Sequence, residues 1–245
     1  AEAMEPRGPD AAGVWSQGRV ALGHRRLKII DLSEAGAQPM VDSELGLAIA
    51  WNGCIYNYKQ LRRELSEQHG YRFFSHSDTE VILKGYREWG ERVVDHLKGM
   101  FAFAVTEIDS GRVILARDRL GVKPLYWTDV EDGSGVGAFR FASSLPALLA
   151  AGGVDTDLDP VALHHYLSFH SVVPAPRTIL KGVRKVPPGT IMRIEPDGRR
   201  TQATYWEPVF ERAAERESWS AREWGEAVLA SLRTAVEGRL VAAVS

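Results

Sequence analysis

The sequence predicts an α+β fold in which antiparallel hairpins dominate most of the chain. Two pairs of apolar segments are joined by Asp109-Ser-Gly111 and by Pro196-Asp-Gly198, and turns of this composition are typical of hairpins. Amphipathic segments with recognisable N-cap residues lie between and after the strands and predict helices.

The first elements are two strands and a helix. Val20–Leu32 and Leu45–Tyr56 are rich in Ile, Leu and Val, and a loop with Gly and Pro separates them, which predicts two strands. Asn57–Gln68 predicts a helix with its first residue as N-cap and with Leu61 and Leu65 on one face.

A second helix and a hairpin follow. Ser77-Asp-Thr-Glu80 has the pattern of a capping box, so a helix is expected to begin there and to end at Gly90. Met100–Ile108 and Arg112–Arg117 predict the two strands of a hairpin. The first of these strands is apolar at nearly every position, which indicates that both its faces are covered.

The last elements mix strands and helices. Phe139–Ala142 predicts a strand, and Asp159-Pro160 predicts the start of a helix, with Asp as cap and Pro at the first position. Thr190–Ile194 and Arg199–Tyr205 predict a hairpin. Ser220-Ala-Arg-Glu223 is a second capping box and predicts a long amphipathic helix.

The ends of the chain and one internal shift in composition bear on domain organisation. After Trp206 the sequence becomes rich in Glu, Arg, Ala and Trp, so we expect a domain boundary near Gly189–Trp206. Residue 1 is not a methionine, and Leu240–Ser245 is an apolar, strand-like run without a closing turn. We therefore expect a fragment of a longer protein.

Composition excludes several classes of protein. The chain has 245 residues, 44% of them apolar and 25% charged, and a formal net charge of −2. This balance gives no reason to expect nucleic acid or an anionic membrane as a partner. No apolar run approaches the roughly 20 residues that span a bilayer. The single cysteine, Cys54, rules out an internal disulfide and is typical of the cytoplasm.

Taken alone, the residues that could carry chemistry favour structural roles. Asn52-Gly53 lies between apolar runs, and this spacing favours a hairpin turn. Asp78 has the position of an acid favoured at a helix start, and Arg117-Asp118 that of a structural ion pair. His164, His165 and His170 lack the spacing of a metal site. Cys54 lies in an apolar strand, which favours an inert thiol.

The order of the motifs resembles the glutaminase domain of asparagine synthases, and it does so along nearly the whole chain. The motifs in the first half are Arg7-Gly-Pro-Asp10, Leu22-Gly-His-Arg-Arg-Leu-Lys-Ile-Ile-Asp31, Gln38-Pro39, Trp51-Asn-Gly-Cys-Ile-Tyr-Asn57 and Ser77-Asp-Thr-Glu80. Those that follow are Gly99-Met-Phe-Ala-Phe-Ala104, Arg117-Asp118, Gly121-Val-Lys-Pro-Leu-Tyr126, Phe141-Ala-Ser143, Val186-Pro-Pro-Gly189 and Tyr205-Trp206.

The resemblance implies a class II glutamine amidotransferase with the four-layer αββα sandwich of N-terminal-nucleophile hydrolases. It assigns residues 1–190 to this domain and residues 205–245 to the start of an α/β synthetase domain. In the family an N-terminal cysteine attacks the side-chain amide of glutamine, and its own α-amino group is the base. The ammonia then reaches an ATP-dependent site, where an adenylated acid captures it.

The resemblance also implies residue roles. Asn52, through its side-chain amide, and Gly53, through its N–H, would form the oxyanion hole. Arg26 would pair with the α-carboxylate of glutamine, and Asp78 would hold its α-ammonium group. The rest of the pocket would be formed by Leu27, Lys28, Ile29, Ile30 and Cys54.

The sequence departs from the family at three places. The nucleophilic cysteine is absent, because the chain begins inside the domain. Cys54 stands where asparagine synthases commonly carry glutamate. The pyrophosphate loop that would bind ATP and Mg²⁺ is expected after Ser245, so no ligand of either cofactor, or of any other metal, is expected in residues 1–245.

The leading hypothesis is therefore a ligase that hydrolyses glutamine and delivers ammonia to an ATP-activated carboxylate, with asparagine formed from aspartate. One alternative keeps the mechanism and makes N-acetylglutaminylglutamine amide, since cysteine follows Asn-Gly in that subfamily. An alternative of a different class is a non-catalytic glutamine-binding module. The expected partners are L-glutamine and the acceptor, with a homodimer as the candidate assembly, in the cytoplasm.

Overall fold

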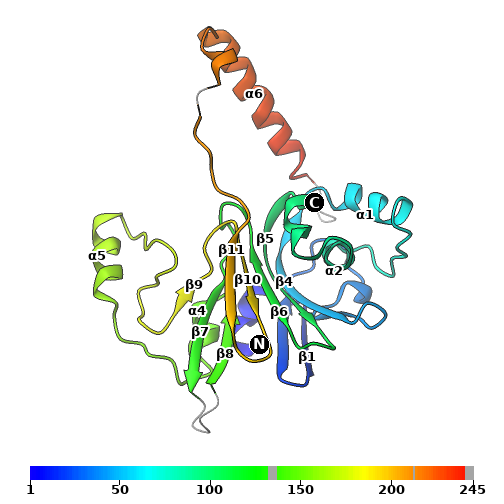
Figure 1. The fold of residues 1–245 in the computed structure, drawn as a ribbon, viewed down its shortest axis with the longest axis vertical. Coiled ribbons are helices and arrows are strands. Elements are labelled where there is room, and N and C mark those ends of the chain that lie inside the picture. Colours follow the sequence, from blue (N-terminus) through cyan, green and yellow to red (C-terminus); the bar gives the residue numbers. More distant parts are fainter. Residues whose placement is uncertain (132–136, 212, 241–245) are drawn as a thin grey trace.

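A computed structural model describes residues 1–131, 137–211 and 213–240. Its largest element is a six-stranded sheet in which each pair of neighbouring strands is antiparallel, in the order β11-β10-β6-β5-β4-β3 (Figure 1). The strands of this sheet are β3 (Met40–Asp42), β4 (Leu47–Ile55), β5 (Gly99–Glu107), β6 (Val113–Arg117), β10 (Thr190–Ile194) and β11 (Arg200–Thr204).

Two smaller antiparallel sheets complete the strands. One is the hairpin of β1 (Ala11–Gln17) and β2 (Val20–Arg26). The other has the order β8-β7-β9. Its strands are β7 (Tyr126–Glu131), β8 (Gly137–Ala142) and β9 (Arg184–Lys185).

Helices and short 3-10 turns connect and flank these strands. Six of the described helices are α1 (Tyr58–Glu67), α2 (Asp78–Trp89), α3 (Val93–His96), α4 (Leu145–Leu149), α5 (Pro160–Ser168) and α6 (Ala221–Glu237). Short 3-10 turns occur at η1 (Glu2–Arg7), η2 (Glu34–Gly36), η3 (Gly90–Arg92) and η4 (Ala214–Arg216). Among the described helices, none combines the length and the apolar character needed to cross a bilayer.

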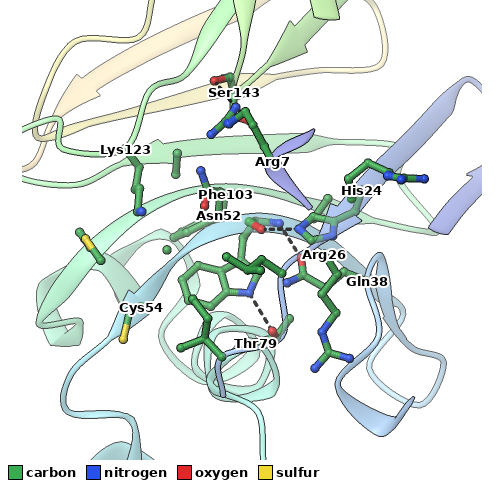
Figure 2. A pocket seen from close by; sticks show the side chains of 18 of the residues that line it. Arg7, His24, Arg26, Gln38, Asn52, Cys54, Thr79, Phe103, Lys123 and Ser143 are labelled. Atoms are coloured by element: carbon green, nitrogen blue, oxygen red, sulfur yellow. Dashed lines mark hydrogen bonds between the residues drawn. The ribbon is translucent and has the colours of Figure 1, made fainter. Parts of the chain in front are cut away.

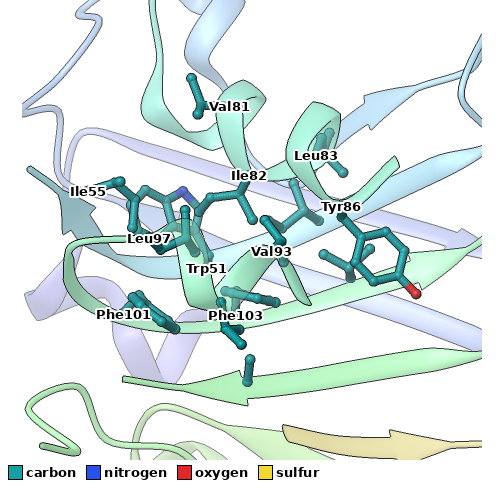
Figure 3. Packing of buried hydrophobic residues seen from close by; sticks show 14 of the residues in the cluster. Trp51, Ile55, Val81, Ile82, Leu83, Tyr86, Val93, Leu97, Phe101 and Phe103 are labelled. Atoms are coloured by element: carbon teal, nitrogen blue, oxygen red, sulfur yellow. The ribbon is translucent and has the colours of Figure 1, made fainter. Parts of the chain in front are cut away.

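The main apolar core lies between α1, α2, α3 and one face of the six-stranded sheet (Figure 3). Alternate residues of a strand point to opposite faces, so Trp51 and Ile55 of β4 and Phe101 and Phe103 of β5 all face this layer. They meet apolar side chains of α2 such as Ile82, which is fully buried.

A second core lies on the other face of the same sheet. The intervening residues of β4 and β5 are small, among them Ala48, Ala102 and Ala104, and they pack toward Leu22 of β2 and the aromatic residues of β7 and β8. The layers are therefore helices, the large sheet and then the two smaller sheets, with α4 against β7 and β8. This arrangement confirms the predicted α+β sandwich.

The predicted hairpins are confirmed. β5 and β6 pair through the turn at Asp109-Ser-Gly111, and β10 and β11 pair through Pro196-Asp-Gly198. Residues 101–105 of β5 are all buried, as the apolar run indicated. The strand predicted at Phe139–Ala142 is β8, and the helices predicted at Asp159-Pro160 and Ser220 begin with side-chain caps at those residues.

Several local predictions were wrong. The strand predicted to run from Val20 to Leu32 ends at Arg26, and the chain then turns, with Asp31 at φ 54°. Ser77 caps α2, but the Glu80 side chain accepts from Phe74 and Ser75 N–H instead of returning to Ser77, so no capping box forms. The Glu80 carboxylate is held away from Ser77 by these N–H groups and by the Lys84 ammonium, which lies 3.3 Å from it.

Two interpretations made from local pattern alone also fail. Asn52-Gly53 forms no turn, because both residues lie inside the continuous strand β4. Arg117 and Asp118 do not pair with each other. Each instead binds backbone groups of the loop that follows them.

The segments around the predicted boundary differ in packing. β10 and β11 extend the six-stranded sheet, whereas α6 stands away from the sheets in Figure 1 and has no buried residue. The segment that follows α6 returns to the domain, where the Arg239 guanidinium lies 5.0 Å from the Tyr56 ring centroid. Of the apolar run predicted at Leu240–Ser245, residues 241–245 lie outside the described residues.

Candidate active site

A cavity of about 740 Å³ lies between the inner face of the six-stranded sheet and the two smaller sheets. Its walls come from η1, β2, β4, β5, β8, the start of α2 and the loop at residues 122–125. Small side chains on β4 and β5, such as Ala50, Ala102 and Ala104, leave this space open. All the site residues predicted from the sequence line it, except Lys28.

Three N–H groups point outward from the same edge of β4, the edge opposite β5. The N–H of Trp51 donates to Gln38 Oε1 at 2.9 Å, and that of Ile55 donates to Asp78 Oδ2 at 3.1 Å. Directions alternate along a strand, so the N–H of Gly53, midway between them, points the same way.

Among the described strands, none pairs with the N–H of Gly53 on that side, because β3 reaches only as far as Ile49 along this edge. The residue must also be glycine for steric reasons. A Cβ at position 53 would lie 2.2 Å from the Met100 carbonyl oxygen. A free N–H on a strand that tolerates no side chain is suited to bind an oxygen atom of a ligand.

Asn52 of β4 lines the cavity, and Figure 2 shows its side chain there. Within the described residues this amide has no hydrogen-bond partner in the protein. The side chain of Asn52 and the N–H of Gly53 are therefore two adjacent unpaired donors.

His24 of β2 supports the same stretch of backbone. Its Nε2 lies 2.9 Å from the Trp51 carbonyl oxygen and must donate, since a carbonyl only accepts. Burial is the main cause that lowers the pKa of His24, so the ring is neutral and Nδ1 is an acceptor. Nδ1 is buried and has no partner among the described residues. His24 thus orients the peptide bond before Asn52, a role that the sequence reasoning missed.

Arg26 ends β2 with its side chain buried, 5% exposed, at the wall of the cavity. Its guanidinium donates to the carbonyl oxygens of Ser33 and Asp31. These two bonds fix the loop after β2, and Gly36 packs so closely on the guanidinium that a Cβ there would lie 2.4 Å from Nη2. Three of the five N–H donors of the guanidinium remain for a ligand.

Asp78 is the buried acid of the cavity, 4% exposed at the start of α2. Burial raises the pKa of its carboxyl group to about 6, although backbone N–H groups of Ile55, Asp78 and Thr79 oppose the shift. A carboxylate that is costly to ionise is stabilised when a cation binds beside it.

The loop after Arg26 completes one side of the cavity. Leu27, Ile29 and Ile30 line it, and the first two are more than a third exposed. Lys28 points elsewhere: its N–H donates to Asp10 Oδ2 at 2.8 Å and its ammonium lies 2.7 Å from Glu34.

Two strand edges also face the cavity. Among the described strands, β2 pairs only with β1, and β8 pairs only with β7. Gly23 of β2 and Ala142 of β8 both line the space between these edges, and Arg7 of η1 reaches across to Ser143, donating to its carbonyl oxygen at 3.0 Å.

Cys54 lies at the cavity wall, half buried. Burial, and secondly the nearby charge of Asp78, raise the pKa of its thiol to about 11. This supports the interpretation of an inert thiol, since the thiolate is the nucleophile.

Alkylation should show this low reactivity. At pH 8 we expect Cys54 in the folded chain to react with iodoacetamide about a hundredfold more slowly than in the urea-unfolded chain. The pKa of the thiol rises from 9.0 to about 11 on folding, and each unit lowers the reactive thiolate fraction about tenfold. Mass spectrometry of the modified peptide over time would measure both rates. Equal rates would show that the thiol is activated.

Within the described residues, no group of three His, Cys, Asp or Glu side chains could hold a metal ion. The histidines of α5 lie outside the cavity. Lys123 belongs to the motif Gly121-Val-Lys-Pro-Leu-Tyr126, from which no role was predicted for it, yet its side chain lines the cavity.

Comparison with known proteins places this geometry in context. The sequence profile of the glutamine amidotransferase domain matches residues 1–206. Over 226 residues the chain is 40% identical to asparagine synthetase [glutamine-hydrolyzing] 1 of Bacillus subtilis, covering 92% of this chain and 34% of that protein. It is 38% identical over 217 residues to a putative asparagine synthetase [glutamine-hydrolyzing] of Mycobacterium tuberculosis, covering 84% and 33%.

Among solved structures, the fold is similar to that of glutamine phosphoribosylpyrophosphate amidotransferase from B. subtilis. The TM-score is 0.56 at 19% identity, with 85% of this chain and 46% of that chain covered. At this identity the likeness concerns the fold alone. The chain spans about a third of the length of the curated relatives it matches.

Proposed function

Because the chain belongs to the glutamine amidotransferase domain family, in the branch of glutamine-hydrolysing asparagine synthetases, we propose that it hydrolyses glutamine for an amide-forming ligase. The reaction converts glutamine and water to glutamate and ammonia. The ammonia attacks an ATP-activated carboxylate in another part of the protein, with aspartate as the acceptor and asparagine as the product.

One observation carries this proposal. Two unpaired donors, the Asn52 amide and the Gly53 N–H, lie in the same cavity as the buried cation Arg26 and the buried acid Asp78. An amino acid with a side-chain amide needs these groups together. Its α-carboxylate binds a guanidinium, its α-ammonium binds a carboxylate, and its amide oxygen lies between two donors.

In the proposed reaction a cysteine thiolate attacks the side-chain amide carbon, and the carbonyl oxygen becomes an oxyanion. Asn52 and Gly53 stabilise that oxyanion more strongly than they bind the neutral amide, which lowers the barrier. The nucleophile implied by the family resemblance is a cysteine before Ala1. The unpaired edges of β2 and β8 support its approach, since an extended segment between them would run along the cavity.

The amide-forming step is proposed for the full-length protein. ATP and Mg²⁺ would act there, in a synthetase domain that α6 begins. Aspartate is the preferred acceptor because the relatives at 37–40% identity carry asparagine synthetase names. We place the enzyme in the cytoplasm and expect a homodimer, which sedimentation of the full-length protein would check.

The test is nitrogen transfer by the full-length protein. We expect AMP and pyrophosphate to form with ATP, Mg²⁺ and aspartate when either glutamine or ammonium is the nitrogen source, because glutamine supplies only ammonia. N-acetylglutaminylglutamine would be offered in parallel as the alternative acceptor.

Three outcomes distinguish the possibilities. AMP formation with aspartate supports the asparagine assignment, and AMP formation only with N-acetylglutaminylglutamine replaces it. Ammonium-dependent activity without glutamine-dependent activity, in protein that still binds glutamine, would favour the non-catalytic module.

A further inference from the structure

Lys123 is a cation in the cavity to which neither the sequence nor the family assignment gives a role. Its side chain is partly buried and lines the cavity beside Cys54 and Asn52, and Figure 2 shows its ammonium group on the side of Asn52. In the described part of the chain this ammonium group has no hydrogen-bond or ion-pair partner.

The loop that carries Lys123 is held by two neighbouring residues. The buried carboxylate of Asp118 accepts the N–H groups of Val122 and Lys123, both at 2.9 Å. The guanidinium of Arg117 donates to the carbonyl oxygens of Gly121 at 2.7 Å and Lys123 at 2.8 Å. The backbone of Lys123 is therefore held at the cavity wall by hydrogen bonds within the domain.

The backbone of the loop adds a second constraint. Gly121 has φ 64°, and a Cβ there would lie 2.9 Å from the Pro188 ring and 3.0 Å from the Arg117 guanidinium carbon. A side chain is excluded on both counts. This close packing holds the loop against the rest of the domain.

Among the described residues that line the cavity, no carboxylate balances the charge of Lys123 at ion-pair distance. Asp78 is the carboxylate of the cavity wall, and it accepts the N–H of Ile55 without approaching Lys123 to ion-pair distance. The charge of Lys123 does reach the Cys54 thiol, whose pKa it lowers against the larger effect of burial. An unpaired ammonium in a preformed wall is a site for an anionic group of a ligand.

We propose that Lys123 binds the γ-carboxylate of glutamate and so sets how strongly a ligand with a negative γ-group competes with glutamine. This inference rests on the proposed function. If the α-groups of the ligand bind Arg26 and Asp78, its γ-group lies at Asn52, on the side of the cavity where Lys123 is held. The neutral amide of glutamine gains little from a cation there, whereas the carboxylate of the product forms a charge-assisted hydrogen bond.

Isothermal titration of L-glutamate and of L-glutamine into residues 1–245 tests the inference. In Lys123→Met we expect the Kd for glutamate to rise about tenfold and that for glutamine to change less than about twofold. Lys123→Arg keeps the charge and should retain most of the glutamate affinity. Lys181→Met is the matched control, since Lys181 pairs with Asp157 outside the cavity.

Each outcome decides between specific alternatives. An unchanged glutamate Kd in folded Lys123→Met, or an equal loss for both ligands, overturns the role of Lys123 and leaves the proposed function standing. Wild-type chain that binds neither ligand contradicts the proposed function itself. Thermal unfolding of each variant distinguishes loss of a contact from loss of the fold, and if the methionine variant is unfolded, Lys123→Gln takes its place.

Discussion

Replacing Asp78 by asparagine should stabilise the fold and weaken glutamine binding in the same protein. Burial raises the pKa of this carboxyl group from 3.8 to about 6, so ionised Asp78 destabilises the folded state. At 1.36 kcal/mol per pKa unit, the cost at neutral pH is about 3 kcal/mol. Asparagine removes the charge and keeps an oxygen that can accept the N–H of Ile55.

The pH dependence follows from the direction of the shift. The folded-state pKa lies above the unfolded value, so the contribution of Asp78 to stability is complete below pH 4 and is lost as the pH rises through about 6. The advantage of the Asp78→Asn variant should therefore be greatest at pH 8, fall to roughly half at pH 5 and disappear at lower pH.

Urea unfolding of both proteins at several pH values would measure this difference, and titration with glutamine at pH 8 would measure binding. The exposed Asp109, in the turn between β5 and β6, supplies the control Asp109→Asn, which should change neither quantity. If the asparagine variant is less stable than wild type at pH 8, the carboxylate is stabilising and our account of its burial is wrong. If glutamine binds as before, Asp78 is not the ammonium site.

In the full-length enzyme, Asn52→Ala and Arg26→Ala should affect different kinetic constants. In the proposed reaction Asn52 donates to an oxyanion that exists only after attack, so its loss should lower kcat by about 10²–10³-fold with KM little changed. The role proposed for Arg26 is to bind the α-carboxylate of glutamine before and during the reaction alike, so its loss should raise KM far more than it lowers kcat.

Steady-state glutaminase assays of the two variants would measure this, with ammonium-dependent AMP formation as the internal control. Because ammonium bypasses the oxyanion hole, Asn52→Ala should keep near-normal activity with ammonium. Arg26→Ala also removes donors to two loop carbonyls, so its unfolding must be followed alongside. The opposite pattern of kcat and KM would show that the two roles are exchanged, and loss of both nitrogen routes in folded Asn52→Ala would show that the two sites are not separable.

Patterns of neighbouring residues correctly predicted the turns and caps that neighbouring residues themselves form. The turn at Pro196-Asp-Gly198 and the cap at Asp159-Pro160 depend on residues adjacent in the chain, and both form as expected. The strands β1 and β7 were missed because neither has a strong apolar run. Ala11–Gln17 has only exposed and half-buried residues, and Tyr126–Glu131 mixes exposed and buried ones.

The site shows the limit of such reasoning. From spacing alone, Asn52-Gly53 favoured a turn, and only the family resemblance suggested an oxyanion hole. The structure keeps both residues in β4, because the strand pairs with β5 along its whole length and buries Trp51 and Ile55 in the core. Long-range packing therefore overrides the turn propensity of the dipeptide.

By itself the sequence determined the class of fold and the hairpins, and the order of its motifs predicted the residues of a glutamine site. Only the tertiary structure decided which groups are free to bind a ligand. It left the N–H of Gly53 without a partner beyond the end of β3, buried Asp78 so that its charge is costly, and held Lys123 in the same cavity. Gly53, Asp78 and Lys123 come from three separate segments of the chain. The sequence pattern of one segment does not show how the other segments pack against it.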